Sequence, residues 1–213
     1  TKVKRKVVKY GQHINLGCFR VEFIRTNHSI ADAAALAIYS PAGTVVHTGD
    51  FKVDYTPIDG GVMDLHRFAE LGKAGVLLLL SDSTNAERKG FTMSESSVGG
   101  VFDDIFSETP KNRIMVATFS SNIHRIQQIV NSAYKYGRKV AIIGRSMVNA
   151  VKTSIELDYL NMPDNTLIDI SEIKNYTDDK LVIITTGSQG ETMSALSRIA
   201  ANEHKQVSIR PGD

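Results

Sequence analysis

The sequence predicts an α/β protein made of two different parts. In roughly the first ninety residues, short apolar or alternating runs bounded by turn residues are typical of β-strands. From about residue 90 onward, strand-like and helix-like segments alternate, and this rhythm predicts a mainly parallel sheet flanked by helices. We therefore expect one domain over residues 1–92 and a second over residues 93–213.

The first part is expected to hold four strands and one helix. The helix is predicted over residues 64–71, where apolar residues recur at helical spacing, and it should end at Gly72, a residue suited to the left-handed position after a helix. The strands are expected at 19–25, 34–39, 44–47 and 76–80.

The second part is expected to alternate strands with helices. Thr92 and Glu95 form a capping-box pattern before an apolar helical face that reaches Phe106. The next helix should begin at Asn122 and close at Gly137. The remaining expected elements are strands at 114–119, 139–143, 167–170, 181–185 and 206–210 and helices at 146–161 and 193–201.

Composition excludes several classes of protein. The 213 residues are 42% hydrophobic, which excludes a disordered chain, and the single Cys18 excludes a disulfide-stapled one and fits a reducing cytoplasm. The longest apolar run, residues 74–80, is too short to cross a membrane, so no membrane partner is expected. With 25 basic against 23 acidic residues, any polyanion site must be local. A basic run over residues 2–9 indicates either a nucleic-acid contact or, more commonly, an exposed edge strand.

Hydroxyl, amide and basic side chains follow three strands of the second part, where each strand leads into a helix. In a parallel sheet these junctions share the edge at which α/β folds bind ligands, and helix-start amides with arginines suit a phosphate. For any one junction, helix capping and tight turns are the more common explanation, but three junctions with the same chemistry shift the balance toward a phosphate site. No dinucleotide fingerprint or Walker loop is present. The residues are Ser120, Ser121, Asn122, His124 and Arg125, then Gly144, Arg145 and Ser146, then Gly187, Ser188 and Gln189.

Two side chains of the first part, His28 and Asp50, each follow a strand-like run and are candidate metal ligands. Imidazole and carboxylate both bind zinc and manganese, although two ligands do not complete a site and an ordinary hydrogen-bonded pair is the alternative. Asp82 follows the most apolar strand and could orient a metal ligand or transfer a proton. Alternatively, Asp82 begins a turn and bonds its own backbone. The other histidines, apart from His124, show no ligand spacing and are expected to be structural or solvated: His13, His47, His66 and His204.

Six motifs, taken together and in order, resemble the ribonuclease J family, in the β-CASP branch of the metallo-β-lactamase superfamily. Several long matches in order are far more specific than any one of them. They are Asn27-His28-Ser29-Ile30, Thr48-Gly49-Asp50-Phe51-Lys52, residues 81–87, residues 117–125, residues 144–147 and residues 186–191.

The resemblance implies a fold, an activity and a metal site. The fold would be part of a metallo-β-lactamase αββα sandwich joined to a β-CASP domain. Two divalent ions, zinc or alternatively manganese, would lie between the domains and activate water for RNA hydrolysis, with 5′–3′ exonuclease and endonuclease action in rRNA processing and mRNA decay. His28 would be a metal ligand, Asp50 the bridging ligand and Asp82 the first β-CASP acid, while the three junctions would hold the RNA backbone or its 5′ phosphate. Family members also form homodimers or homotetramers, which adds RNA-decay proteins and further copies as expected partners.

The departures from the family pattern lead to an expectation about this chain alone. The family's His-x-His-x-Asp-His motif and its later histidines are not in the sequence, and Ala31 stands where proline is frequent. The chain, which begins at Thr1 without methionine, is therefore expected to be a central piece of a longer enzyme, inactive alone and a weak metal binder. The alternatives are a different β-CASP nuclease, for DNA repair or RNA 3′-end processing, and a non-catalytic RNA-binding or scaffolding relative.

Overall fold

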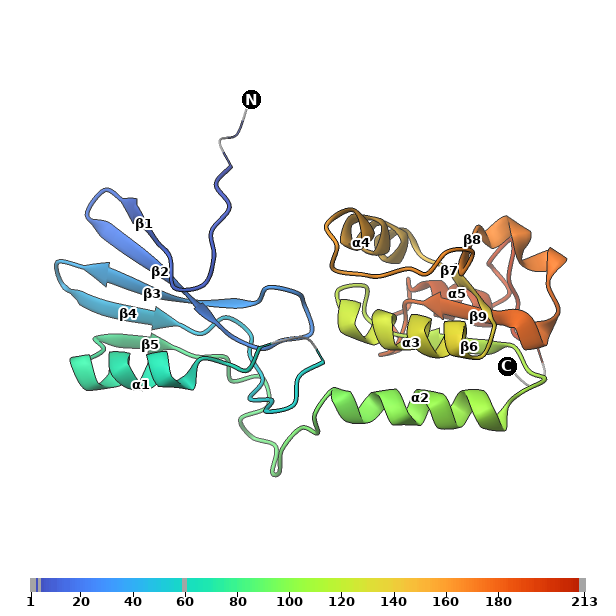
Figure 1. Cartoon of the computed structure of the whole chain (residues 1–213), viewed down its shortest axis with the longest axis horizontal. Coiled ribbons are helices and arrows are strands. Elements are labelled where there is room, and N and C mark those ends of the chain that lie inside the picture. Colours follow the sequence, from blue (N-terminus) through green and yellow to red (C-terminus); the bar gives the residue numbers. More distant parts are fainter. Residues whose placement is uncertain (1–2, 4, 59–60, 211–213) are drawn as a thin grey trace. The chain divides into compact units, whose positions relative to one another are not determined.

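A computed structural model describes residues 3, 5–58 and 61–210. The chain divides into two compact units, one of residues 1–28 and 32–95 and the other of residues 29–31 and 96–213, and each carries its own sheet (Figure 1). In the expected basic run, Lys2 and Lys4 lie outside the described residues, and residues 5–9 form no strand, so the edge-strand interpretation is wrong for them.

The first unit is built on a five-stranded sheet in the order β1-β2-β3-β4-β5. Its first four strands pair antiparallel in succession, and β4 pairs parallel with β5. As a result β2, β4 and β5 all run the same way and end at one edge of the sheet. The four expected strands are confirmed, with β5 shorter than predicted, and β1 was not anticipated. The strands are β1 His13–Leu16, β2 Phe19–Arg25, β3 Ala34–Ser40, β4 Gly43–His47 and β5 Leu78–Leu80.

One helix, α1 (Leu65–Ala74), packs on one face of this sheet. Asp64 caps its start by accepting a hydrogen bond from the Arg67 amide at 3.0 Å. The expected stop at Gly72 is wrong: the helix continues to Ala74, and the amide of Gly75 bonds the carbonyls of Leu71 and Gly72. Gly75 has a φ of 101°, so Gly75, and not Gly72, provides the positive φ at the end of this helix. The small core beneath α1 contains Ile24, Ala35, Ala37, Val46 and Leu71.

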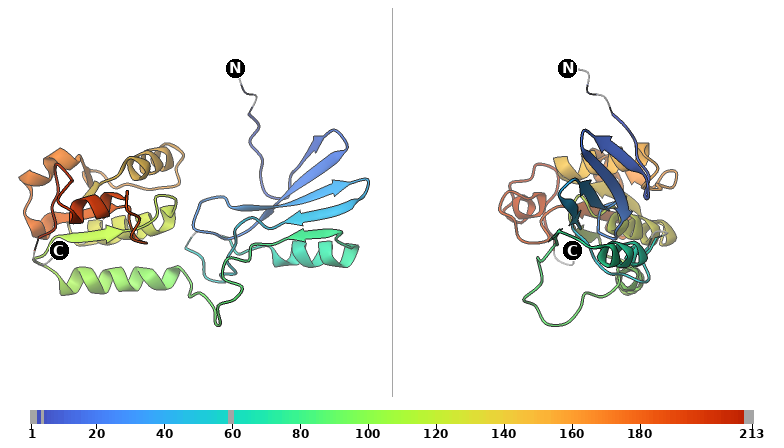
Figure 2. Two further views of the ribbon diagram at one scale, coloured as in Figure 1. Left: turned by 180° about the vertical axis from the view of Figure 1, so that it is seen from behind. Right: turned by 90° about the vertical axis from the view of Figure 1, so that its left-hand side faces the viewer.

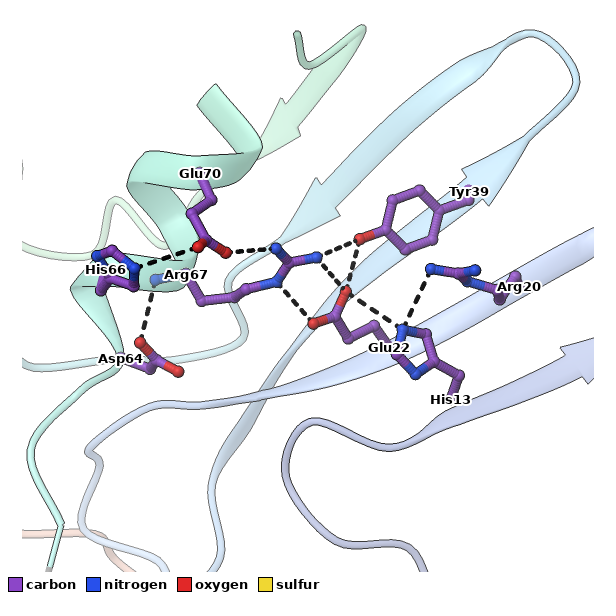
Figure 3. Close-up of polar contacts among 8 residues, drawn as sticks. All are labelled: His13, Arg20, Glu22, Tyr39, Asp64, His66, Arg67 and Glu70. Carbon is purple, nitrogen blue, oxygen red and sulfur yellow. Dashed lines mark hydrogen bonds and ion pairs between the residues drawn. The ribbon is translucent and has the colours of Figure 1, made fainter. Parts of the chain in front are cut away.

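A polar network ties α1 to the strands beside that core (Figure 3). The Glu22 carboxylate, on β2, is buried and accepts two hydrogen bonds from the Arg67 guanidinium, at 2.7 and 2.9 Å. The Tyr39 hydroxyl, on β3, donates to the same carboxylate at 2.5 Å. Arg67 also donates to Glu70 at 2.6 Å, one turn along the helix. The network therefore joins two strands and the helix through one buried charge.

The edge strand β5 presents an exposed apolar row. The side chains of Leu78, Leu79 and Leu80 are 49%, 59% and 45% exposed, and Leu77 before them is 64% exposed. Edge strands are usually short or protected by charge, so a run of four exposed leucines departs from an ordinary edge strand.

The second unit has a four-stranded, all-parallel sheet in the order β6-β9-β7-β8. Alternate residues of β9 point to opposite faces: Val182 and Ile184 enter a core shared with α2, α3 and α4, and Ile183 enters a second core shared with α5. Helices thus cover both faces, in three layers (Figure 1 and Figure 2). The elements are α2 Ser96–Glu108, β6 Ile114–Ala117, α3 Ile123–Lys135, β7 Lys139–Ile142, α4 Arg145–Glu156, β8 Leu167–Ile168, η1 Ile170–Asn175, η2 Asp178–Lys180, β9 Leu181–Thr185 and α5 Ala195–Ala200.

The helix α3 agrees with its sequence pattern over its whole length. Asn122 caps it by accepting from the Arg125 amide at 3.0 Å, and the inward face of Ile126, Ile129, Val130 and Ala133 has no exposed surface. Gly137, with a φ of 65°, follows its end, where the Arg138 amide bonds back to the Ala133 carbonyl.

Other boundaries differ from expectation. The helix α2 begins at Ser96, so its capping position is residue 95, and Thr92 lies three residues too early to cap it. The helix α4 ends at Glu156 and not at residue 161, because Leu160 turns back to bond the Ser154 carbonyl and is buried outside the helix. Residues 206–210 form no strand, and α5 is shorter than predicted. The α/β class and the parallel sheet flanked by helices are confirmed. No helix among the described residues is long and apolar enough to cross a bilayer.

Candidate functional site

The first unit brings together the three residues that the sequence singled out in it. His28 follows β2, Asp50 follows β4 and Asp82 follows β5, and these strands end at the same edge of the sheet. The His28 Nε2 atom lies 3.8 Å from the Asp50 Oδ2 atom. The side chain of Asp50 is 76% exposed and that of His28 is 35% exposed, so both can be reached from solvent.

The backbone around this pair is held by bonds between the loops. The Lys52 amide donates to the Asn27 carbonyl at 2.7 Å, which ties the loop of Asp50 to the loop of His28 across the intervening strand β3. Gly49, with a φ of 60°, lets the chain turn there, and a Cβ on it would lie 3.1 Å from the Ala34 carbonyl oxygen. These contacts set the separation of the two side chains.

Asp82 is bonded both locally and across the edge. Its carboxylate accepts from the amide and hydroxyl of Thr84, at 2.9 and 2.7 Å, which is the turn-forming role weighed above. Its other oxygen accepts from the Phe51 amide at 3.4 Å, beside Asp50. The Thr84 hydroxyl, the Thr84 and Phe51 amides and the nearby His28 hold the pKa of Asp82 below its ordinary value, in spite of partial desolvation. Asp82 is therefore an anionic group that orients the Phe51 backbone next to Asp50.

The donor set for a metal ion is only partial. An imidazole nitrogen and a carboxylate 3.8 Å apart suit two ligands of a zinc or manganese ion. Within the described ranges, however, no group of three or more His, Cys, Asp or Glu side chains is arranged to hold one. His28 and Asp50 can therefore supply two ligands of a metal site, but they do not form a complete site.

The remaining histidines of the chain, apart from His124, make local contacts. His13 Nε2 lies 3.7 Å from Glu22, and His66 Nε2 lies 3.1 Å from Glu70, within the network on α1 (Figure 3). The Nδ1 atom of His47 accepts from the Gly49 amide, and that of His204 accepts from the Gln206 amide. Burial and the charge of Arg198 lower the pKa of His204.

In the second unit, the parallel strands place the three predicted junctions on one edge. The amide of Thr118 bonds the carbonyl of Thr185, and the amide of Ile143 bonds the carbonyl of Ile184, so the ends of β6 and β7 flank the end of β9. Gly144 is close enough to β9 that a Cβ on it would lie 3.3 Å from the Thr186 hydroxyl.

The local chemistry of the three junctions differs. At the first junction, the Asn122 side chain is buried and caps its own helix, which supports the capping explanation for that residue. Ser120 and Ser121 precede Asn122, and His124 and Arg125 lie in the first turn of the helix, where both are partly buried. At the second, Gly144 makes no side-chain cap bond, and Arg145 and Ser146 are exposed at the start of α4.

The third junction does not place a helix start at the edge. Gly187, Ser188 and Gln189 belong to a turn that the Gly190 amide closes on the Gly187 carbonyl, and α5 begins only at Ala195. The Gln189 amide bonds Glu191, and the Ala195 amide bonds the Thr186 hydroxyl. The expectation of helix-start amides at all three junctions is therefore wrong for this one, because its amides are used within the turn.

Sequence reasoning missed the contacts that fix the site and found only its side chains. Thr48, which is 5% exposed, accepts from the Asp82 amide through its hydroxyl and so links the ends of β4 and β5. Lys52 donates to the Met93 carbonyl at 2.5 Å and lies 3.7 Å from Asp54. The only signal for these roles was position, since Thr48 directly precedes the Gly-Asp pair at residues 49 and 50 and Lys52 lies two residues after it.

Comparisons with known proteins agree on one family. Residues 111–213 match the family described as Ribonuclease J, beta-CASP domain. The chain is 49% identical over 208 residues to Ribonuclease J of Helicobacter pylori (strain ATCC 700392 / 26695), covering 98% of this chain and 30% of that protein. Ribonuclease J of Synechocystis sp. (strain ATCC 27184 / PCC 6803 / Kazusa) is 49% identical over 98% of this chain and 32% of its own length. Ribonuclease J of Mycobacterium tuberculosis (strain CDC 1551 / Oshkosh) is 45% identical over 97% of this chain and 37% of its own length.

A solved structure shares the fold at low identity. A crystal structure of a protein of unknown function from Enterococcus faecalis V583 matches with a TM-score of 0.61 and 16% identity, covering 86% of this chain and 45% of that chain. The chain spans about a third of the length of the curated relatives named above.

Proposed function

Since the chain belongs to the ribonuclease J family, we propose that it forms part of a hydrolase that cleaves RNA phosphodiester bonds with the help of divalent metal ions. The observation that supports this most directly is the His28–Asp50 pair, 3.8 Å apart and open to solvent where β2 and β4 end. In this proposal the first unit belongs to the metallo-β-lactamase part of the enzyme, and the second is its β-CASP domain.

The three residues at this edge have different proposed roles. His28 would bind a metal ion through Nε2, and Asp50 would bind it through its carboxylate, placed to bridge two ions. When bound, two divalent ions, zinc or alternatively manganese, would supply a hydroxide near neutral pH and would neutralise charge on the phosphoryl group. Asp82 would act as a positioning residue, because it fixes the Phe51 amide next to Asp50.

The RNA backbone or its 5′ phosphate is proposed to bind in the second unit, at the edge formed by the β6–α3 and β7–α4 junctions. Support comes from the exposed Arg145 and Ser146 at the start of α4 and from the shared edge of the parallel strands. Gly187, Ser188 and Gln189 would line this edge as a turn. The 5′–3′ exonuclease and endonuclease modes, roles in rRNA processing and mRNA decay, a homodimeric or homotetrameric assembly, RNA-decay partners and a cytoplasmic location belong to the same proposal.

The proposal is tested with a chimera in which this chain replaces the matching 30% of the Helicobacter pylori relative. We expect zinc- or manganese-dependent cleavage of 5′-monophosphorylated RNA and much slower cleavage of the matched DNA. Asp50→Asn should lower the rate by about 100-fold or more, as the loss of a metal ligand does. Asp32→Asn, an exposed carboxylate outside the site, is the matched control. Equal rates for the Asp50 variant and its parent would contradict the assigned role.

The 213-residue chain by itself is proposed to be inactive and to bind metal weakly. Catalytic zinc sites use three protein ligands, and the described residues supply a two-ligand set. Calorimetric titration with zinc and with manganese, read beside an RNA-cleavage assay, tests this. Turnover by the isolated chain that disappears in Asp50→Asn would overturn it.

A further inference from the structure

The loop between β5 and α2 carries an exposed aromatic side chain next to two cations. Phe91 is 89% exposed, and it follows Arg88 and Lys89, which are also exposed. Residues 85–94 include no helix or strand, and the loop is drawn in green after β5 in Figure 1. A single exposed apolar side chain is common on protein surfaces. The hydrogen bonds at the two ends of the loop determine where Phe91 lies.

Both ends of the loop are fastened to the segment that carries Asp50. At its start, Asp82 bonds Thr84 and also the Phe51 amide, at 3.4 Å. At its end, Lys52 donates to the Met93 carbonyl at 2.5 Å. The loop therefore begins beside Phe51, the neighbour of Asp50, and ends against the side chain of Lys52, two residues after Asp50.

A second set of hydrogen bonds holds the end of the loop at Ser94, one residue after Met93. The Ser94 hydroxyl donates to Asp54 at 3.0 Å, and the Glu95 amide donates to the same buried carboxylate at 3.1 Å. The Thr56 hydroxyl bonds the Ser94 hydroxyl at 2.9 Å, which brings residue 55 to the base of the loop. Tyr55 is 73% exposed, so a second aromatic ring faces solvent close to the anchor of the first.

Aromatic rings with neighbouring cations are the usual surface for single-stranded nucleic acid, because bases stack on the rings while the cations meet the phosphates. Close to Phe91, the loop carries two positively charged side chains, Arg88 and Lys89, and one negatively charged side chain, Glu87. A contact with another protein would also explain the exposed ring and Arg88, but lysine is depleted at protein interfaces, so Lys89 favours the nucleic acid.

We infer that residues 86–93, together with Tyr55, form a stacking platform for the bases of single-stranded RNA beside the His28–Asp50 pair. This inference rests on the proposed function for its substrate class. Phe91 stacks on a base, Tyr55 offers a second ring, and Arg88 and Lys89 contact the flanking phosphates. The platform positions unpaired RNA and takes no part in the chemical step.

The test measures binding of a 5′-labelled, unstructured RNA 12-mer to the 213-residue chain by fluorescence anisotropy. Phe91→Leu keeps an apolar side chain and removes the ring, and it should weaken binding by about 5- to 100-fold, the usual effect of losing one stacking side chain. Phe91→Tyr should restore binding. Phe19→Leu is the matched control, because Phe19 is 47% exposed at the start of β2, the end of that strand opposite to His28.

Salt dependence separates the two kinds of contact. Replacing Arg88 and Lys89 by glutamine should lower the slope of log Kd against log salt by about 1 to 2, whereas Phe91→Leu should leave that slope unchanged. Equal RNA binding by Phe91→Leu and its parent overturns the platform and leaves the proposed function intact. If the parent chain binds no single-stranded RNA, the proposed substrate class falls, and the platform falls with it. Altered self-association of Phe91→Leu with unchanged RNA binding would assign the loop to a protein contact and overturn the inference.

Discussion

Replacing Glu22 by glutamine should loosen α1 from the sheet. The Glu22 side chain is 5% exposed and accepts two hydrogen bonds from Arg67 and one from Tyr39. Glutamine keeps the size but removes the charge, and its NH2 group donates and cannot accept, so at least one donor loses its partner. Breaking a buried pair costs about 3–5 kcal/mol. Because Arg67 is 30% exposed and keeps Glu70, we expect the free energy of unfolding to fall by about half of that, roughly 2 kcal/mol.

The matched control is Glu70→Gln. Glu70 bonds the same arginine at 2.6 Å but is 48% exposed, so its loss should cost less than about 1 kcal/mol. Urea unfolding followed by far-ultraviolet circular dichroism measures both variants, since the chain has no tryptophan to report by fluorescence. Hydrogen exchange should show the loss of protection in β2, β3 and α1. Equal shifts for the two variants would refute the claim that the buried carboxylate holds the helix.

The same carboxylate makes a pH-dependent contribution. The Arg67 hydrogen bonds hold the pKa of Glu22 below its ordinary value of 4.5, although burial opposes them. Because the folded-state pKa lies below the unfolded one, this contribution is present above about pH 4.5 and is lost as the pH falls through the folded value. We expect the unfolding free energy of Glu22→Gln to change less than that of the parent between pH 6 and pH 3. A parallel decline in both proteins would contradict this assignment.

Substitutions at Gly187 and Asn122, each with a matched control, test particular contacts of the second unit. Gly187→Ala should lower the free energy of unfolding in urea by about 3 kcal/mol, because the φ of Gly187 is 119° and a Cβ there would lie 2.5 Å from the Ser194 hydroxyl. Gly190 has a φ of 74° and open space around it, so Gly190→Ala should lower the same free energy by about 1 kcal/mol. Similar losses at the two glycines would contradict the close approach. Asn122→Ala should lower stability by about 1 kcal/mol by removing the cap on the Arg125 amide, and Asn122→Asp should retain it. An unchanged midpoint for Asn122→Ala would argue against the cap.

Local patterns predicted the elements whose burial is regular. The helix α3 buries Ile126, Ile129 and Val130 at helical spacing, and it has a capping residue at its start and a glycine after its end, so each signal agrees with the others. Where a boundary depends on a contact from elsewhere, the pattern failed. Thr92 and Glu95 match a capping box, yet the Glu95 amide is bonded to Asp54, 41 residues earlier, and the helix starts after it.

The candidate site shows the same division. Its side chains, His28 and Asp50, could be named from short motifs, but their 3.8 Å separation depends on the pairing of β2 and β4 with β3, which the motifs do not encode. The Glu22–Arg67 pair, 45 residues apart in the chain, gave no sequence signal at all. Short motifs predicted the type of side chain at the site, whereas the distance between the side chains depends on how the strands pair.

The unequal covering of the two sheets bears on how long each unit survives digestion. Fifteen buried side chains fill one core of the second unit and five fill the other, whereas the cluster under α1 contains five. Because a protease cuts a chain where it opens most often, trypsin should cleave the first unit early, starting in the Arg88–Lys89 loop, and leave a resistant piece beginning near Ser96. That piece would allow the parallel-sheet half to be isolated without redesigning the gene.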